Sequence, residues 1–316
     1  MMKKIRAASF FAGVGGIELG FSKLIDVVYS NEFNKNSIKT YEQNFDIKVD
    51  DRDIRQVNEN DIPNFDMLLA GFPCQAFSIA GYRQGFDDEK GRGNLFFELE
   101  RIFKYRKPEI IFLENVKNLV THDKNRTFKV ILNSLENAGY YVKHKVLNTM
   151  KYGNTPQNRE RIYILAFKNK KVYENFDFPD EIELSKSISD MLLQDVDRKY
   201  YYDERFKHFD LIKEEITKEN TIYQWRRKYV RENKSNVSPT LTANMGTGGH
   251  NVPLIKVNDN IRKLTPRECF NFQGFPEDFK LGDISDSHLY QQAGNSVSVK
   301  VIERISEKLK EAIEKS

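Results

Sequence analysis

Short apolar runs recur along the first half of the chain without alternating with polar residues. They cover residues 5–11, 27–29, 67–69 and 110–113, and a later run covers 162–167. A strand that is apolar on both sides is buried on both faces, as in parallel sheets that helices cover. Patterns with helical spacing lie at 95–102 and 128–138. The sequence therefore predicts an α/β fold with a mostly parallel sheet and helices on both faces.

The chain changes character after about Lys171. Residues 172–260 are rich in Lys, Asp, Glu, Asn and Tyr, and their periodicity is weaker. This change predicts a second, more irregular domain, which agrees with the usual length per domain for 316 residues. An amphipathic helical pattern returns near the end, where four apolar residues share one face: Ile302, Ile305, Leu309 and Ile313.

Composition excludes several classes of protein. Apolar residues make up 39% of the chain, which is enough for a substantial core and excludes a disordered chain. No apolar run approaches the roughly 20 residues of a membrane span. The two cysteines, Cys74 and Cys269, are too few for a disulfide framework, and with no signal peptide we expect a reducing cytoplasm. The net charge of +4 is too small to identify a nucleic-acid partner.

A glycine-rich turn follows the first predicted strand and opens a helix. It reads Phe11, Ala12, Gly13, Val14, Gly15 and Gly16. Glycines allow a tight turn and the close approach of a ligand, although this spacing is not the dinucleotide pattern G-x-G-x-x-G. Glu32 ends the second strand, where a carboxylate can hold a ribose, and Asp53-Ile54 follow the next extended stretch. The three features together predict an adenosine-type ligand and leave open a dinucleotide or S-adenosylmethionine.

Cys74 lies just past the third predicted strand, in the sequence Gly-Phe-Pro-Cys-Gln at 71–75. Open α/β sheets carry their chemistry at this carboxyl edge, and the preceding proline makes the backbone rigid. Most free cysteines are small core residues. Here a polar loop with four glycines follows at 78–93, which argues against burial and favours a reactive thiol.

A carboxylate and two arginines end or precede neighbouring strands. Glu114 ends the fourth strand at the same edge as Cys74, where general acid chemistry is possible. Arg159 and Arg161 alternate with Glu160 before the next strand, so we expect them to share one side of an extended backbone. A solvated basic edge is the ordinary interpretation, and recognition of an anion or a carbonyl is the functional one.

These pieces resemble the C5-specific DNA cytosine methyltransferases, and the matching blocks cover most of the chain in the family's order. The blocks are residues 11–16, Glu32, Asp53, 71–75, 91–96, 114–116, 157–161, 262–268 and 294–297. The resemblance implies a Rossmann-like, S-adenosylmethionine-dependent catalytic domain at 1–172. It also implies a target-recognition domain at 173–285 and a segment at 286–316 that returns to the catalytic domain.

The resemblance implies catalytic roles. Cys74 would add to C6 of cytosine, which makes C5 electron-rich enough to accept a methyl group. Glu114 would protonate N3, which requires a carboxyl with a raised pKa. Arg161 would hold O2 of the base and Arg159 would sit beside the cysteine. Asn115 would order the catalytic loop, and Gln75 counts with the catalytic residues.

The resemblance also implies the cofactor S-adenosyl-L-methionine, with S-adenosyl-L-homocysteine as product. Phe11 would stack on the adenine, Glu32 would hold the ribose, and Asp53 and Ile54 would bracket the adenine ring. Other residues implied in cofactor binding are Ala12, Gly13, Gly15, Gly16, Leu95, Asn295, Ser296 and Val297. One position departs from the family: Ser9 stands where an aspartate is frequent.

A base inside a duplex must be flipped out to be reached. We expect residues 78–93 to close over it. The stretch 222–234 has five basic residues and one acidic residue, with Tyr223, Trp225 and Tyr229 among them, as phosphate contact needs. Taken on charge alone, the same stretch is a solvated helix face. The residues expected to contact DNA are Ser78, Arg226, Arg227, Thr240 and Gly248.

We expect double-stranded DNA as the partner, no membrane, a monomer in the bacterial cytoplasm, and a cognate restriction endonuclease that acts on the same sites. No histidine or cysteine has metal-ligand spacing, so no metal is predicted, and Cys269 is expected in the core. Three alternatives remain. The target could be tRNA, although a variable region of about 110 residues favours DNA. The chain could be a nicotinamide-dependent oxidoreductase, or a DNA-binding module without catalysis.

Overall fold

The computed structural model describes residues 3–73, 95–226, 228–245 and 252–316. The chain divides into two compact units. Unit 1 holds residues 1–147, 160–179 and 305–316, and unit 2 holds 148–159 and 180–304. The boundaries of these units differ from the functional boundaries that the sequence predicts. The functional boundaries stay a prediction. Among the helices of the described ranges, none is long and apolar enough to span a membrane.

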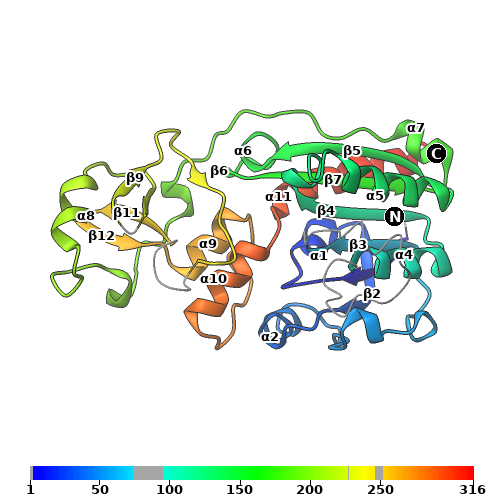
Figure 1. The fold of residues 1–316 in the computed structure, drawn as a ribbon, viewed down its shortest axis with the longest axis horizontal. Coiled ribbons are helices and arrows are strands. Elements are labelled where there is room, and N and C mark those ends of the chain that lie inside the picture. Colours follow the sequence, from blue (N-terminus) through cyan, green and yellow to red (C-terminus); the bar gives the residue numbers. More distant parts are fainter. Residues whose placement is uncertain (1–2, 74–94, 227, 246–251) are drawn as a thin grey trace. The chain divides into compact units, whose positions relative to one another are not determined.

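Unit 1 contains a six-stranded sheet with the order β2-β1-β3-β4-β7-β5 (Figure 1). The strands are β1 (Ile5–Phe10), β2 (Ile25–Asn31), β3 (Met67–Gly71), β4 (Ile110–Val116), β5 (Tyr141–Asn148) and β7 (Glu160–Phe167). The first four are parallel, and β7 is antiparallel to β4. The predicted apolar runs are confirmed as strands, and most of their residues are buried, although Val27 and Val28 of β2 are only half-buried. Sequence reasoning missed β5, because most of this strand at the sheet edge is exposed or half-buried and it carries no apolar run.

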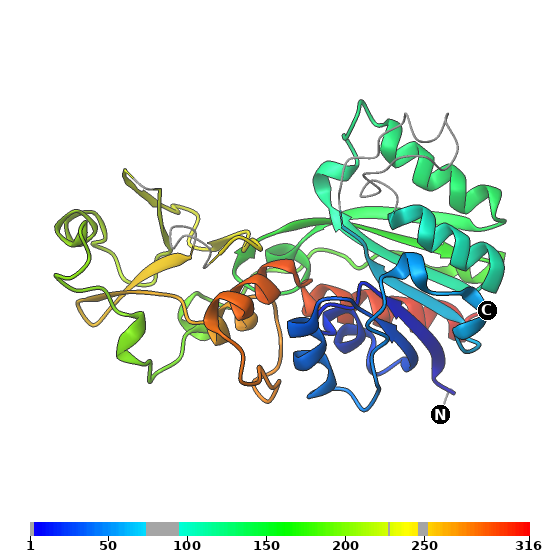
Figure 2. The same cartoon turned by 60° about the horizontal axis from the view of Figure 1, so that its bottom comes forward.

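Helices cover both faces of this sheet (Figure 2). One face carries α4 (Leu95–Arg106) and α5 (Arg126–Asn137), which bury Leu99, Ile102, Ile131 and Leu135 against the strands. On the other face, α1 (Gly16–Phe21) sets the Phe21 ring 4.9 Å from the Phe112 ring of β4. The remaining helices of this unit are α2 (Lys35–Glu42), α7 (Lys170–Asn175) and the C-terminal part of α11 (Val299–Glu314).

Unit 2 is built around a four-stranded antiparallel sheet with the order β12-β11-β8-β9. Its strands are β8 (Tyr223–Trp225), β9 (Val230–Glu232), β11 (Pro253–Val257) and β12 (Asn260–Lys263). A short strand β6 (Gln157–Asn158) pairs in parallel with β10 (Ser238–Pro239). The helices are α6 (Thr149–Tyr152), α8 (Phe209–Glu215), α9 (Pro266–Phe272) and α10 (Asp286–Asn295). Cys269 of α9 is fully buried, which confirms it as a core residue.

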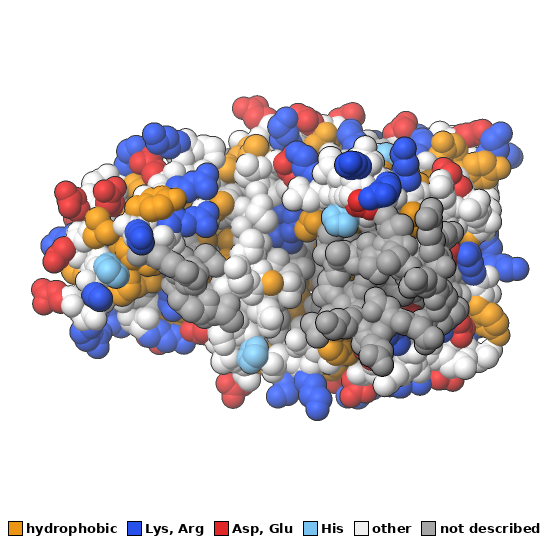
Figure 3. All heavy atoms as spheres, in the orientation of Figure 1, with side chains coloured by type: hydrophobic (Ala, Val, Ile, Leu, Met, Phe, Trp, Pro, Cys, Tyr) orange, Lys and Arg blue, Asp and Glu red, His pale blue; other side chains and the backbone are white. Residues whose placement is uncertain are grey.

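The basic stretch 222–234 forms the β8–β9 hairpin, so the expectation of a helix face is wrong. Tyr223 and Trp225 are buried against α8 and β11, because alternate residues of β8 face the core of unit 2. They are therefore unable to contact phosphate as predicted, whereas Tyr229 is 58% exposed. The described basic side chains of this stretch are exposed: Arg226, Lys228, Arg231 and Lys234. Figure 3 shows several Lys and Arg side chains on the part of the surface that unit 2 forms.

Candidate active site

The glycine turn after β1 has the left-handed backbone that its sequence predicts. Gly13 has φ +57° and Gly15 has φ +88°, and the Gly15 N–H donates to the Ala12 carbonyl at 2.9 Å. A Cβ on Gly15 would lie 2.1 Å from the Phe45 ring, so glycine is required there for space as well as for conformation. Phe11 also has a positive φ of +53°, which is a strained conformation for an aromatic residue.

A cavity of about 460 Å³ opens at the carboxyl ends of β1, β2 and β3. Five residues predicted for cofactor binding line it: Phe11, Glu32, Asp53, Ile54 and Leu95. Sequence reasoning missed the other lining residues, which are Asn31, Phe33, Arg52, Arg55 and Pro73. Their signal was position, since each neighbours a predicted residue or Cys74. Phe33 is 66% exposed, which is unusual for an aromatic ring and places an uncovered apolar surface at this cavity.

The two carboxylates of the cavity are held by local hydrogen bonds. Glu32 accepts the Gly13 N–H at 3.0 Å through Oε2 and the Asn34 N–H at 2.8 Å through Oε1. Burial nevertheless raises the pKa of Glu32. Asp53 accepts the Arg55 N–H at 3.0 Å, and the hydrogen bonds of the Arg55 guanidinium lower the pKa of Asp53. Both carboxylates are thus fixed in place before any ligand arrives.

A buried polar cluster lies where the sequence departs from the family pattern. Ser9, Glu18, Ser30 and Tyr41 are each at most 1% exposed. Burial raises the pKa of Glu18 to about 7, and the Ser9 and Tyr41 hydroxyls lower it only in part. A carboxyl group is therefore present beside position 9, although it comes from α1 and not from the strand.

Glu114 and Arg161 form an ion pair at the edge of the sheet. Arg161 Nε lies 3.2 Å from Glu114 Oε1, and their side chains are 12% and 9% exposed. Glu114 is the register partner of Gly71, three residues before Cys74, and a Cβ on Gly71 would lie 3.6 Å from Glu114 Oε2. The Asn115 amide donates to the Phe72 carbonyl at 2.8 Å. Strand pairing and this hydrogen bond therefore connect Glu114 and Asn115 to the start of the cysteine segment.

Arg159 belongs to unit 2 and is 2% exposed. Its guanidinium donates to the backbone carbonyls of Leu241 at 2.9 Å, of Gly294 at 3.3 Å and of Ser296. Arg159 and Arg161 therefore have different sets of partners in different units. Asn295, Ser296 and Val297 follow one another at the end of α10 in unit 2, and their contribution to cofactor binding stays a prediction.

Several predicted site residues lie outside the described part of the structure. These are Cys74, Gln75, Ser78, Arg227 and Gly248. Thr240, predicted to contact DNA, donates through Oγ1 to the Asn158 carbonyl at 2.7 Å. Within the described ranges, no group of three or more His, Cys, Asp or Glu side chains could hold a metal ion.

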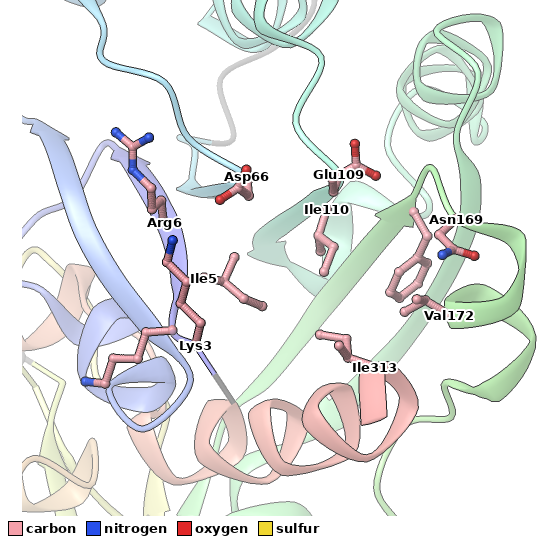
Figure 4. A pocket seen from close by; sticks show the side chains of 11 residues that line it. Lys3, Ile5, Arg6, Asp66, Glu109, Ile110, Asn169, Val172 and Ile313 are labelled. Carbon is pink, nitrogen blue, oxygen red and sulfur yellow. The ribbon is translucent and has the colours of Figure 1, made fainter. Parts of the chain in front are cut away.

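A second cavity, of about 370 Å³, lies at the opposite edge of the sheet (Figure 4). Ile5 and Ile110 begin β1 and β4, and with Val172 and Ile313 they give it an apolar lining. Charged side chains at this cavity include Lys3, Arg6, Asp66 and Glu109. None of the predicted site residues is among the residues that line it.

A mostly parallel α/β sheet with a lined cavity and a buried carboxylate–guanidinium pair at its carboxyl edge is typical of enzymes that use a nucleotide-like cofactor. The family model for the C-5 cytosine-specific DNA methylases matches residues 5–311. The chain therefore belongs to the C-5 cytosine-specific DNA methylase family.

Two curated relatives illustrate the similarity. The Type II methyltransferase M.Bsp6I of Bacillus sp. (strain RFL6) is 57% identical over 310 residues, which span 96% of this chain and 98% of the relative. The Type II methyltransferase M.HhaI of Haemophilus parahaemolyticus is 40% identical over 318 residues, spanning 96% of this chain and 93% of the relative.

Solved structures share the fold. The Entamoeba histolytica methyltransferase EhMeth superposes with a TM-score of 0.73 at 24% identity, and the match covers 98% of both chains. Spodoptera frugiperda DNMT2 gives a TM-score of 0.74 at 20% identity, covering 98% of this chain and all of the other. The predicted α/β methyltransferase fold is confirmed.

The family and its relatives confirm the predicted activity as well as the fold. The protein is a DNA (cytosine-5)-methyltransferase: it transfers a methyl group from a donor to C5 of cytosine in DNA. Duplex DNA is favoured over the tRNA alternative, and the oxidoreductase and the non-catalytic module are set aside.

Proposed function

We propose that the protein methylates C5 of a flipped-out cytosine in one specific double-stranded DNA sequence, with S-adenosyl-L-methionine as the donor. The observation that carries this proposal is the cavity at the carboxyl edge. Its lining brings together Phe11 after β1, Glu32 after β2 and Asp53 from the connection between α2 and β3, with Pro73, the residue before Cys74. This lining supports a cofactor site next to the start of the cysteine segment.

The residues of the cavity fit this cofactor better than a dinucleotide. Ile54, Leu95 and Phe11 supply apolar surface for an adenine ring, and Glu32 is positioned for ribose hydroxyls. The two arginines that line the cavity are already paired, Arg52 with Asp50 and Asp61, and Arg55 with Asp53. Because of these pairings, the described lining has no unpaired cation that could bind a pyrophosphate. S-Adenosyl-L-methionine contains no pyrophosphate, so it does not need such a cation.

The cofactor supplies an electrophilic methyl group, and the chain's own residues prepare the cytosine to receive it. The Cys74 thiolate adds to C6 while the Glu114 carboxyl protonates or hydrogen-bonds N3, which draws electrons into the ring. C5 takes the methyl group, and S-adenosyl-L-homocysteine is released. A base from solvent removes the proton on C5, and the electrons of that C–H bond form the C5=C6 double bond as the C6–S bond breaks. The thiolate leaves and the aromatic ring is restored. Arg161 holds O2 of the base, and its ion pair with Glu114 keeps both side chains in place.

Unit 2 is proposed to read the DNA sequence. Its exposed basic hairpin, with Arg226 and Lys228, offers phosphate contacts, and the segment at Thr240 leads toward Gly248. The predicted boundaries of 1–172, 173–285 and 286–316 express this functional division. We further propose that the enzyme works as a monomer in a bacterial cytoplasm and protects DNA from a restriction endonuclease with the same target, as the Type II class of its relatives suggests.

The test is methylation by the purified protein of plasmid DNA with labelled S-adenosylmethionine, followed by bisulfite sequencing. Cys74→Ala should abolish transfer and still bind DNA, and duplexes with 5-fluorocytosine should trap a covalent adduct with the wild type. Cys269→Ala is the matched control, because this buried cysteine lies in α9 of unit 2. Turnover by Cys74→Ala, or methyl transfer to tRNA and not to DNA, would overturn the proposal.

A further inference from the structure

Leu241 is held by side chains at both polar groups of its backbone. Its N–H donates to Gln157 Oε1 at 3.1 Å, and its carbonyl accepts from Arg159 Nη1 at 2.9 Å. Gln157 and Arg159 are 0% and 2% exposed, so water does not compete for these bonds. Gln157 belongs to β6, and Arg159 directly follows this strand. β6 also pairs with β10, which ends two residues before Leu241. We call Gln157 and Arg159 the clamp.

The same two side chains hold other backbone segments of unit 2. Gln157 Nε2 donates to the Phe272 carbonyl at 2.7 Å and to Gln273 Oε1 at 3.2 Å. Arg159 Nη2 reaches the carbonyls of Gly294 and Ser296 at the end of α10. The clamp therefore fastens Leu241 to the end of α9 and the end of α10 at once.

Backbone packs directly on backbone where the clamp closes. A Cβ added to Gly294 would lie 2.2 Å from both the carbonyl carbon and the carbonyl oxygen of Thr242. Because those atoms belong to the main chain, they cannot move aside as a flexible side chain could. Residues 240–242 are thus fixed by two side chains on one side and by α10 on the other.

The choice of residue fits a positioning role. Burying a guanidinium is unfavourable unless its N–H donors find acceptors. A guanidinium fork offers five N–H donors in a fixed plane, so it can hold carbonyls from separate segments in one geometry. A lysine ammonium carries the same charge without that geometry. The Leu241, Gly294 and Ser296 carbonyls use this property of Arg159.

The clamp residues lie just before Arg161 along the chain. Arg159 is the last residue of its segment in unit 2, and Arg161, two residues later, pairs with Glu114 in unit 1. We infer that Gln157 and Arg159 are positioning residues for target recognition, which set the place of the segment 240–245 relative to β6 within unit 2. This inference rests on the proposed function, in which the segment continues into the DNA-reading loop.

The test compares Arg159→Lys and Gln157→Met with the wild type on the same plasmid DNA. We expect KM for DNA to rise about tenfold, as for the loss of one charge-assisted hydrogen bond. The fraction of methyl groups at sites that differ from the wild-type target by one base should also rise. The kcat should change less than about threefold, and calorimetric affinity for S-adenosylhomocysteine should stay within about twofold, since neither residue lines the cofactor cavity.

Arg262→Lys is the matched control. Arg262 is equally buried in unit 2, but its guanidinium pairs with Glu268 at 2.8 and 2.6 Å and does not contact residues 240–245. It should lower the unfolding temperature without changing site choice. A loss of kcat with unchanged KM and site choice in Arg159→Lys would place Arg159 at the reacting cysteine and overturn the inference. Equal loss of specificity in Arg262→Lys would overturn it too. Failure of the proposed function is distinct, since the wild type itself would then not methylate DNA.

Discussion

Arg161 Nε lies 3.2 Å from Glu114 Oε1, and the two side chains come from the neighbouring antiparallel strands β7 and β4. The register places Arg161 opposite Val116, so the guanidinium reaches along the strand to a carboxylate two residues away. Both side chains are nearly buried, and removal of one leaves the other charge without this partner. In the proposed mechanism, the pair therefore couples the catalytic step to the pairing of β4 with β7.

Glu114→Gln should reduce methyl transfer by about a hundredfold to ten-thousandfold, because an amide cannot supply the proton that N3 requires. The measurement is the initial rate of label transfer to DNA, with DNA affinity as the accompanying readout. A second ion pair, Lys117–Glu160, joins the same two chain segments but is 53% and 41% exposed. Lys117→Ala should leave the rate unchanged and alter stability by no more than about 1 kcal/mol. Equal rate losses in both variants would contradict a chemical role for Glu114.

Gly15→Ala should destabilise the fold and weaken cofactor binding. Left-handed backbone costs an alanine about 1–2 kcal/mol, and the clash with Phe45 adds to this cost. Gly139→Ala isolates the first effect, since Gly139 has φ +86° with no atom within 4 Å of its Cβ position. The unfolding temperature should therefore be highest for the wild type, lower for Gly139→Ala and lowest for Gly15→Ala. Equal unfolding temperatures for the two variants would show that Phe45 moves aside freely.

Glu18 should make stability depend on pH. Burial raises its pKa from 4.5 to about 7, so the folded state favours the neutral carboxyl. Its contribution to the free energy of unfolding is fully present below about pH 4.5 and is lost as the pH rises through 7. The loss is on the order of 3 kcal/mol. Glu18→Gln removes this titration, so its stability relative to the wild type should increase from pH 5 to pH 8. Urea unfolding at both pH values measures this effect. Glu307→Gln, at an exposed site of α11, is the control, and its free energy of unfolding should change with pH as that of the wild type does.

The exposed side chains of the β8–β9 hairpin should govern the salt dependence of DNA binding. Replacing both Arg226 and Lys228 with alanine removes two potential phosphate contacts. The slope of log affinity against log salt should then fall by about 0.9 for each contact. The double variant Lys308→Ala/Lys310→Ala, on α11 in unit 1, serves as the control. An unchanged slope in the hairpin variant would place the phosphate contacts elsewhere.

The buried centre of unit 1 was predictable because strands that are apolar on both faces leave continuous runs in the sequence. The strand β5 was not, because a mostly exposed strand at a sheet edge leaves no such run. The same limit applies to Tyr223 and Trp225. Their place among basic residues suggested a binding surface, but the period of two in β8 turns them into the core.

Some residues that line the cavity were predictable because their chemistry marks them as ligand-binding residues. Others line it only because of their position in the chain, and these were not predictable. Glu32 and Asp53 stood out as carboxylates at strand ends, whereas Phe33 and Arg52 line the cavity only because they neighbour them. The partners of Arg159 were invisible in the sequence. They are backbone carbonyls from residues 82 to 137 positions away, which no residue pattern announces.

Those partners have a consequence for how such an enzyme diversifies. At Leu241 and Ser296 the clamp binds only main-chain atoms, so these hydrogen bonds do not depend on the side chains that the two positions carry, whereas Gly294 must stay without a Cβ. Mutations can change what the segment 240–245 displays while the hydrogen bonds that seat it persist. Under the proposed function, a change of target sequence through this segment would then need no matching change in Gln157 or Arg159.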